Sequence, residues 1–205
     1  MNQRNLFVLL GLSCVCMSCM HDLGKTPPGK IVDIITIDST IVLDIRYATS
    51  NNFTNTVLYP VAKAKLRSAA AESLASIQKE LRSKKLGLKI YDAYRPLSIQ
   101  YKLWEVVPNE NYVANPKKGS KHNRGAAVDL TIIDSLGNEL EMPTGYDDFS
   151  EKASHEYMEI SETARKNRAL LKDVMIRHGF LPIKSEWWHY DFQGWEQFDI
   201  MDEPL

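Results

Sequence analysis

The spacing of apolar residues changes along the chain, and each period predicts a different element. Residues 31–48, IVDIITIDSTIVLDIRYA, alternate apolar and polar positions and are rich in β-branched side chains, which predicts two short strands around Asp38. Residues 51–60, NNFTNTVLYP, break the pattern and are expected to form a loop. Steps of three and four then predict a helix between residues 61 and 86, with Gly87 as its stop. The apolar stripe of this helix consists of Leu66, Ala70, Leu74, Ile77 and Leu81.

The rest of the chain alternates between strands and helices. Ser98 is expected to cap one helix after the loop at Arg95, and Gly179 to terminate the last one. The order β-β-α-β-α-β-α-β predicts a single α+β domain whose mainly antiparallel sheet is flanked by helices. The predicted strands cover residues 86–94, 125–134 and 186–192, the helices residues 98–107 and 161–178, and the domain residues 31–205.

The N-terminus has the three parts of a secretory signal peptide. MNQR gives a positive start, LFVLLGLSCVCM an apolar run too short for a comfortable membrane span, and residues 20–30 a polar linker with proline and glycine. Residues 1–19 are therefore expected to export the protein to the periplasm. Cys19, which follows a serine, resembles the lipidation point of a bacterial lipoprotein, although Cys16 stands where leucine is usual. Lipidation at Cys14 and an ordinary cleaved signal are the alternatives.

The composition limits which binding partners and which metal ligands are expected. The 205 residues are 44% hydrophobic and 25% charged with a formal net charge of -1, which fits one domain and gives no electrostatic reason to expect nucleic acid. A membrane contact is expected only through the N-terminal lipid. Because all three cysteines lie in the signal segment, any metal must bind to histidine, aspartate or glutamate.

The stretch SKHNRGAAVDL contains two candidate metal ligands, His122 and Asp129. Gly125 and two alanines remove bulk between them, where the chain must turn into the predicted central strand. A catalytic zinc ion usually has three protein ligands and leaves its fourth position to water, whose pKa it lowers towards neutrality. A third ligand must therefore come from elsewhere in the chain.

Each of the other histidines has a competing interpretation. His21 lies in the linker, and His178 suits the end of a helix. His155 begins HEYME, which lacks the second histidine of a metalloprotease helix and is interpreted as a solvated surface. His189, the remaining candidate, follows Glu186 by three residues in SEWWHY. A histidine in an aromatic strand is more often a core residue, but a neighbouring carboxylate favours a catalytic site.

Glu186 and Arg95 have the properties of catalytic groups. A glutamate beside a zinc-bound water can take the proton of that water and pass it to a leaving amine. Two tryptophans after Glu186 would keep the site dry, unless they belong only to the core. Arg95, fixed by a following proline, could stabilise negative charge on a carbonyl oxygen. The alternative is a surface arginine paired with Asp92.

With these residues in place, the sequence resembles the D-alanyl-D-alanine dipeptidases, the group of zinc D,D-peptidases that includes the vancomycin-resistance dipeptidase. The resemblance covers residues 31 to 200. It rests on S-x-H-x-x-G-x-A-x-D at residues 120–129, E-W-W-H at 186–189, D-x-Y-R-P at 92–96 and IRYATSNNFTNTVLY at 45–59. Asn55 departs from the glycine that is usual after N-F-T.

The resemblance implies a zinc D,D-peptidase fold and hydrolysis of D-alanyl-D-alanine to two D-alanines. It implies one zinc ion per chain, Glu186 as general base and acid, and Arg95 as the group that stabilises the transition state. The expected zinc ligands are His122, Asp129 and His189. The residues expected to bind the substrate's termini are Ser120, Tyr47 and Asp148, with Asp148 as partner of the ammonium and Asp147 as the alternative.

Rival functions differ in substrate or in chemistry. A D,D-carboxypeptidase or peptidoglycan endopeptidase would combine the same metal site with an open cleft, and a non-catalytic muropeptide-binding lipoprotein would be expected to lack Glu186 or a ligand. A nucleophilic hydrolase is disfavoured because the domain has neither G-x-S-x-G nor cysteine. Export indicates turnover of wall-derived dipeptide rather than antibiotic resistance. The basic cluster Lys117, Lys118, Lys121 and Arg124 is most simply a solvated face.

Overall fold

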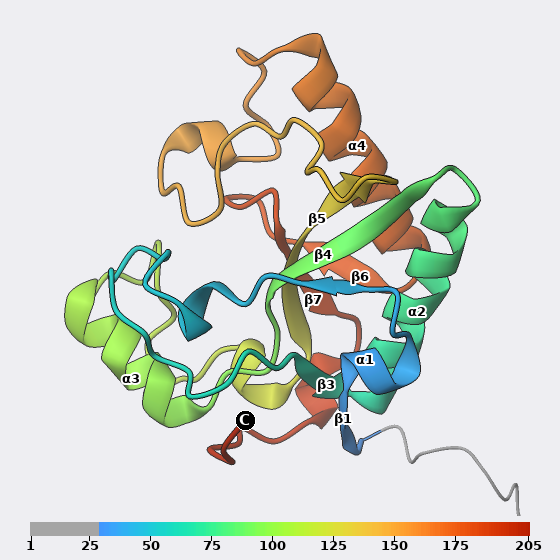
Figure 1. Cartoon of the computed structure of the whole chain (residues 1–205). Coiled ribbons are helices and arrows are strands. Elements are labelled where there is room, and N and C mark those ends of the chain that lie inside the picture. The colour runs from blue at the N-terminus through green and yellow to red at the C-terminus, as the bar shows by residue number, and fades with distance from the viewer. Residues whose placement is uncertain (1–28) are drawn as a thin grey trace, which may run out of the picture.

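A five-stranded sheet lies at the centre of the molecule in the computed structural model, which describes residues 29–205 (Figure 1). Its strands are β2 (Val42–Leu43), β4 (Leu86–Asp92), β5 (Ala127–Asp134), β6 (Phe180–Pro182) and β7 (His189–Phe192). Their order is β2-β4-β5-β7-β6, and only β2 pairs in parallel with its neighbour. The mainly antiparallel sheet is therefore confirmed. The predicted signal peptide and its candidate lipidation sites, Cys14 and Cys19, lie outside the described residues.

The alternating segment after the linker is only partly extended. Strand β1 (Ile31–Asp33) is followed by a single helical turn, α1 (Ile34–Ile37), before the chain reaches β2. The Asp33 carboxylate accepts a hydrogen bond from Ile35 N at 3.3 Å and so caps this turn. The prediction of two strands meeting at Asp38 missed the turn, because a local side-chain cap competes with the extended backbone that the alternation favours.

Helix α2 (Ser68–Arg82) begins later than its apolar period predicts. Residues 65–67 instead form β3 (Lys65–Arg67), an antiparallel partner of β1 in which Leu66 lies opposite Val32. Leu66 is buried in this strand. Because it is apolar and lies four residues before Ala70, it fits the helical period although it is not part of the helix. The other four residues of the predicted stripe are buried in α2. Pairing with a distant strand overrides the local period at this helix end.

Helix α3 (Leu97–Val106) takes its N-terminal cap from the other end of the chain. The prediction that Ser98 caps it is wrong, because Ser98 lies inside the helix and the residue at the cap position is Pro96, which makes no capping hydrogen bond. Ser98 N instead donates to the Asp202 carboxylate at 2.7 Å. Leu97 N donates to Met201 O at 3.1 Å in the same tail. The C-terminal segment thereby satisfies backbone donors that the local sequence leaves free.

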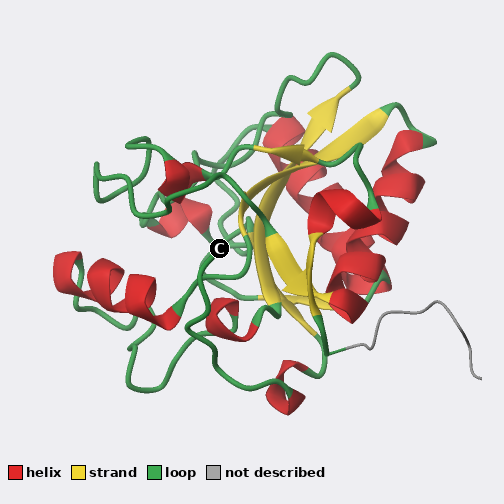
Figure 2. Ribbon diagram, turned by 60° about the horizontal axis from the view of Figure 1, so that its bottom comes forward, coloured by secondary structure: helices red, strands yellow, loops and turns green. Residues whose placement is uncertain are grey.

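Helix α4 (Glu162–Arg177) follows its prediction closely. Ser161 Oγ accepts a hydrogen bond from Ala164 N at 2.9 Å at the start, and Gly179 follows the end with a φ of 83°. His178 Nε2 lies 3.0 Å from the Glu80 carboxylate of α2, so its place at the helix end is confirmed. Helices α2 and α4 lie on one side of the sheet, and α3 lies with the long loops on the other (Figures 1 and 2). Within residues 29–205, no helix has the length and apolar character needed to cross a membrane.

Candidate active site

The three residues predicted to bind a metal come together where β5 meets β7. Asp129 on β5 lies directly opposite His189 on β7, and His122 begins the short helical turn that precedes β5. Gly125 ends this turn with a φ of 66°, and a Cβ added there would lie 2.5 Å from Ile31 Cδ1. Both backbone conformation and space therefore require glycine, as the sequence predicts.

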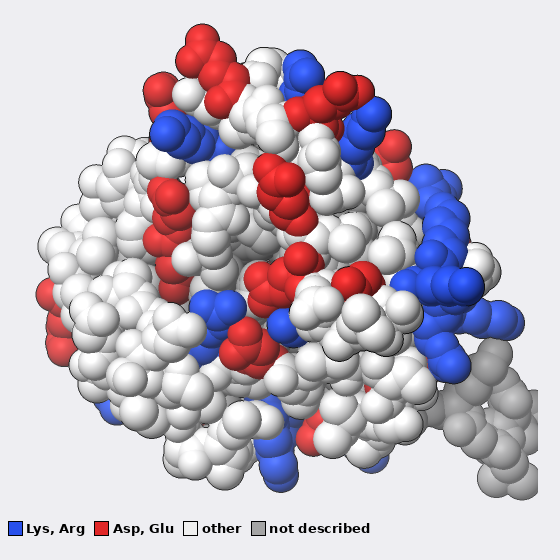
Figure 3. Space-filling model, turned by 45° about the horizontal axis from the view of Figure 1, so that its top comes forward, with Lys and Arg blue, Asp and Glu red and all other residues white. Residues whose placement is uncertain are grey.

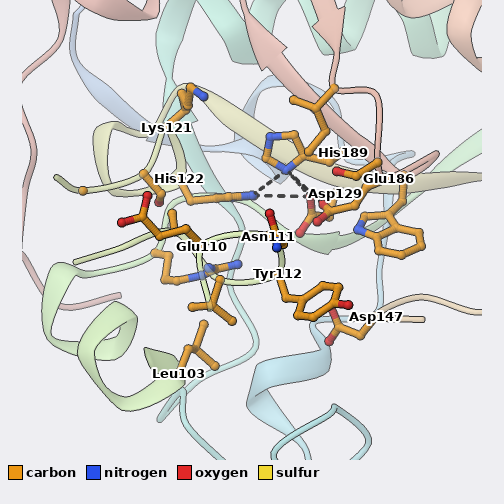
Figure 4. A pocket seen from close by; sticks show the side chains of 18 of the residues that line it. Leu103, Glu110, Asn111, Tyr112, Lys121, His122, Asp129, Asp147, Glu186 and His189 are labelled. Atoms are coloured by element: carbon orange, nitrogen blue, oxygen red, sulfur yellow. Dashed lines mark hydrogen bonds and ion pairs between the residues drawn. The ribbon is translucent and has the colours of Figure 1, made fainter. Parts of the chain in front are cut away.

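The ligand atoms of these residues converge on one point (Figure 4). His122 Nε2 lies 3.2 Å from His189 Nδ1, and Asp129 Oδ1 lies 3.4 Å from the first nitrogen and 2.9 Å from the second. All three side chains are buried. Two imidazole nitrogens and a carboxylate oxygen are a donor set that suits a zinc ion, and three protein ligands leave a position for water or substrate.

Neighbouring groups hold His122 and Asp129 in this arrangement. His122 Nδ1 donates to the Ala93 carbonyl at 2.6 Å. Because a carbonyl oxygen can only accept, the proton of a neutral His122 is on Nδ1 and the lone pair of Nε2 faces the other two ligands. Tyr146 donates from its hydroxyl to Asp129 Oδ2 at 2.9 Å, which leaves Oδ1 for the metal. Such outer hydrogen bonds orient metal ligands.

Charge makes the same point receptive to a cation. Burial lowers the pKa of His189, but its hydrogen bonds to Asp129 and Asp191 outweigh this effect and raise the pKa to about 10. Burial raises the pKa of Asp129, but His122 beside it holds that pKa well below its ordinary value. The cluster therefore favours bound positive charge, and a metal cation can take the place of the proton.

Glu186 lies beside the converging atoms without being one of them. Its Oε2 is 3.9 Å from His189 Nδ1, and burial raises its pKa to about 7. A carboxylate in this position can accept a proton and return it, and a bound cation would favour its ionised form. Trp188 lines the cavity next to it, whereas Trp187 is a core residue whose Nε1 donates to Thr144 Oγ1 at 2.9 Å.

Arg95 combines the two interpretations that the sequence left open. It is paired with Asp92, to which its Nε and Nη2 donate at 3.0 and 2.7 Å, but the pair is buried and Arg95 is only 8% exposed. Nη1 donates to Gln100 Oε1 at 2.9 Å, and the guanidinium lies 5.1 Å from the centre of the Tyr47 ring. Three of the five guanidinium N–H groups are thus engaged, and Arg95 is one of the residues that line the cavity.

Of the residues expected to bind the two ends of the substrate, some line the cavity and one does not. Ser120 and Tyr47 line the cavity. Asp147, the alternative ammonium partner, also lines it, whereas Asp148, the partner expected from the resemblance, is not among the lining residues. Tyr47 donates from its hydroxyl to Asp147 Oδ2 at 3.3 Å, and burial raises the pKa of Asp147 well above its ordinary value. Burial thus favours the neutral acid, whereas a neighbouring ammonium group would favour the carboxylate. The Asp148 carboxylate instead accepts a hydrogen bond from Ser150 N at 2.8 Å. The geometry therefore makes Asp147 the better candidate partner for an ammonium group.

A cavity of about 440 Å³ connects these side chains. Acidic and basic side chains lie around a hollow on this face of the molecule (Figure 3). Three aromatic residues from separate loops form part of its wall: Phe149 lies 5.2 Å from Phe53 and 5.0 Å from Tyr112 between ring centres. Sequence reasoning missed this wall because loops of different lengths bring it together. It also missed Asp191, although side chains two residues apart on a strand point to the same face, so that Asp191 lies on the face of His189.

The interpretation of HEYME as a solvated surface holds for Glu156, Met158 and Glu159, which are exposed, but not for the ring of His155. No helix of the described residues contains it, and both ring nitrogens are buried without a hydrogen-bond partner among those residues. The ring lies 6.0 Å from that of Tyr190, and burial lowers the pKa of His155 to about 4. Its exclusion as a metal ligand stands, because the cluster of candidate ligands in the described chain is His122, Asp129 and His189.

Comparisons with known proteins match nearly all of the described chain. A family described as D-ala-D-ala dipeptidase matches residues 29–202. The D-alanyl-D-alanine dipeptidase of Escherichia coli K12 is 36% identical over 86% of this chain and 91% of the relative. That of Enterococcus faecium is 30% identical over 72% and 83%, respectively. A solved structure of VanYB in complex with D-alanine-D-alanine is 17% identical over 67% of this chain and 77% of that chain, with a TM-score of 0.44.

Proposed function

The chain belongs to the D-Ala-D-Ala dipeptidase family, and from this premise we propose that it hydrolyses D-alanyl-D-alanine to two molecules of D-alanine with one bound zinc ion. The observation that carries the proposal is the convergence of two imidazole nitrogens and one carboxylate oxygen next to a second carboxylate, that of Glu186, which is not one of the converging groups. His122, Asp129 and His189 would hold the zinc ion. When bound, zinc supplies a Lewis acid that polarises a carbonyl group and lowers the pKa of a water molecule.

The protein's own groups provide proton transfer and charge stabilisation. Glu186 takes the proton of the attacking water and transfers it to the nitrogen of the leaving D-alanine, which departs as a neutral amine. Negative charge develops on the carbonyl oxygen as the water attacks. Arg95 has two N–H groups left for that oxygen after its hydrogen bonds to Asp92 and Gln100. Because Arg95 is buried and held by these partners, it needs little reorganisation during the reaction.

The cavity also offers a partner for the amino terminus of a dipeptide. Asp147 is held by Tyr47 at the wall of the cavity, where a carboxylate can pair with a free ammonium group. A longer peptide has an amide at this position instead, and the half-buried Asp147 would be left without a cationic partner. Asp147 therefore supports a preference for dipeptides over peptides with an extended amino end.

The decisive experiment measures D-alanine release by the zinc-loaded protein from D-Ala-D-Ala, from L-Ala-L-Ala and from a longer peptide ending in D-Ala-D-Ala. Cleavage of the free D,D-dipeptide alone, lost in Glu186→Gln while zinc binding is retained, is the expected result. Cleavage of the longer peptide instead would assign the protein to the D,D-carboxypeptidases. Zinc binding without any cleavage would favour the non-catalytic muropeptide-binding protein.

We further propose that the enzyme acts outside the cytoplasm on dipeptide derived from cell-wall turnover. The support is the positive start, apolar run and polar exit of residues 1–30, with Cys19 as the preferred lipidation point. Fractionation of the native cells and labelling with a fatty-acid analogue test this. Label in the wild type that disappears in Cys19→Ala is expected, and recovery of the protein in the cytoplasm would contradict the proposal.

A further inference from the structure

A dipeptide substrate carries a second charge, its carboxylate, and the cavity must provide for it on the side away from Asp147. The two Cα atoms of a dipeptide are about 3.8 Å apart, with the scissile bond between them and the charged groups outside them. The ammonium and the carboxylate therefore lie on opposite sides of the catalytic point. Figure 4 shows Asp147 on one side of the three ligand residues and Lys121 on the other.

Lys121 differs from the other cationic residues that line the cavity. Arg95 is engaged by Asp92 and Gln100, as described above. Lys118 is exposed and bound to both carboxylate oxygens of Glu110, at 3.0 and 2.7 Å. Arg124 donates from Nη1 to the Phe198 carbonyl. Each of these three cations already has a close hydrogen-bond acceptor.

The ammonium group of Lys121 has longer contacts with its neighbours than these three cations have. Its Nζ lies 3.4 Å from Asp191 Oδ2 and 5.2 Å from the centre of the Trp195 ring, and its side chain is 36% exposed. An ammonium group has three N–H donors, and a single contact at 3.4 Å leaves most of that capacity for a ligand. The neighbouring Ser120 also lines the cavity, and its hydroxyl, which accepts from Asn123 N, keeps its own proton to donate.

We propose that Lys121 binds the carboxylate of the dipeptide and so determines that the enzyme prefers substrates with a free C-terminal acid. This inference rests on the proposed function and adds a specificity-determining residue to it. Lys121 and Asp147 then bind the two charged ends of the substrate, the carboxylate and the ammonium group, on opposite sides of the scissile bond. A charged hydrogen bond to the carboxylate gives about ten- to hundredfold discrimination against a neutral C-terminus.

The experiment compares kcat/KM for D-Ala-D-Ala with that for D-Ala-D-Ala amide. Wild-type enzyme is expected to prefer the acid, Lys121→Gln to lose most of that preference, and Lys121→Arg to keep it. Lys117→Gln is the matched control, because Lys117 is an exposed lysine of the same segment. The loss in Lys121→Gln should come mainly from a higher KM for the acid, with the amide little affected.

The rival role for Lys121 is structural, through its contact with Asp191 and hence with His189. In that case Lys121→Gln would slow both substrates equally and weaken zinc binding, and this result would overturn the proposal. An unchanged acid-to-amide ratio would also overturn it. The wild type decides the proposed function separately: if it cleaves neither compound and binds neither in calorimetry, both the dipeptidase assignment and this inference fall.

Discussion

Asp191 accepts a hydrogen bond from His189 Nε2 at 2.9 Å, two residues further along the same strand. This contact leaves Nδ1, rather than Nε2, to face Asp129 and His122. Carboxylate partners of this kind fix the orientation and tautomer of a ligating histidine and increase its basicity. Asp191 is therefore a positioning residue for the candidate metal site, although it does not contact the point where the candidate ligands converge.

Replacing Asp191 by alanine should weaken zinc binding about ten- to hundredfold, because His189 loses the acceptor that orients it. Asp191→Asn should have a smaller effect, since its amide oxygen can still accept the hydrogen bond. Competition with a fluorescent chelator measures the affinity directly, without reference to activity. The exposed Glu196→Ala is the control, and equal affinities for Asp191→Ala and this control would contradict the assigned role.

Neighbouring aspartates should differ sharply in their effect on substrate binding. Asp147→Asn removes the carboxylate that would pair with the substrate's ammonium group and should raise KM for D-Ala-D-Ala about ten- to hundredfold. Its amide suits the local backbone, because Asn tolerates the φ of 60° found at this position. Asp148→Asn should leave KM nearly unchanged, since its amide oxygen can still accept from Ser150 N. The reverse ranking in steady-state kinetics would reinstate Asp148 as the ammonium partner.

The C-terminal tail should contribute to stability through helix α3. Asp202→Ala removes the acceptor of Ser98 N, and the loss of a helix cap costs about 1 kcal/mol of unfolding free energy. For a domain of this size that corresponds to a fall in Tm of about 2–4 °C by calorimetry. Asp199→Ala, a change at an exposed aspartate of the same tail, should have little effect. Equal melting temperatures for the two variants would argue against the distant cap.

His155 should make the fold sensitive to mild acid. In the unfolded chain its pKa is near the ordinary 6.5, whereas burial, together with Lys172 and Arg168, lowers the folded pKa to about 4. Between these values the unfolded state binds more protons, so stability is complete above pH 6.5 and falls as the pH drops towards 4. The loss attributable to this group is about 1–3 kcal/mol.

His155→Phe keeps an aromatic ring against Tyr190 and removes the titration. Urea unfolding of both proteins from pH 4 to pH 8 measures the unfolding free energy as a function of pH. The two curves should run parallel above pH 6.5, and the unfolding free energy of the variant should fall less at lower pH. Every other titratable group is common to both proteins, so the difference between the two curves isolates the contribution of His155. Curves that stay parallel down to pH 4 would show that the imidazole titrates normally in the folded state.

The sequence by itself determined which residues are the candidates for the chemistry of the site. His122 and Asp129 could be identified because a glycine and small residues separate them at the start of an apolar strand, and Gly125 indeed adopts the positive φ that such a turn requires. Glu186 and His189 lie close together in the chain, so their relation is local. The helix at residues 161–178 and the central strand were also determined by local period and local caps.

Tertiary structure decided whatever depends on partners distant in the chain. The cap of α3 comes from Asp202, and residues 65–67 form a strand because β1 lies beside them. The choice between Asp147 and Asp148 depends on which carboxylate the loop turns towards Tyr47. No local pattern encodes such contacts, because hydrogen bonding and burial depend on distance in space, whereas a sequence period reports only spacing along the chain.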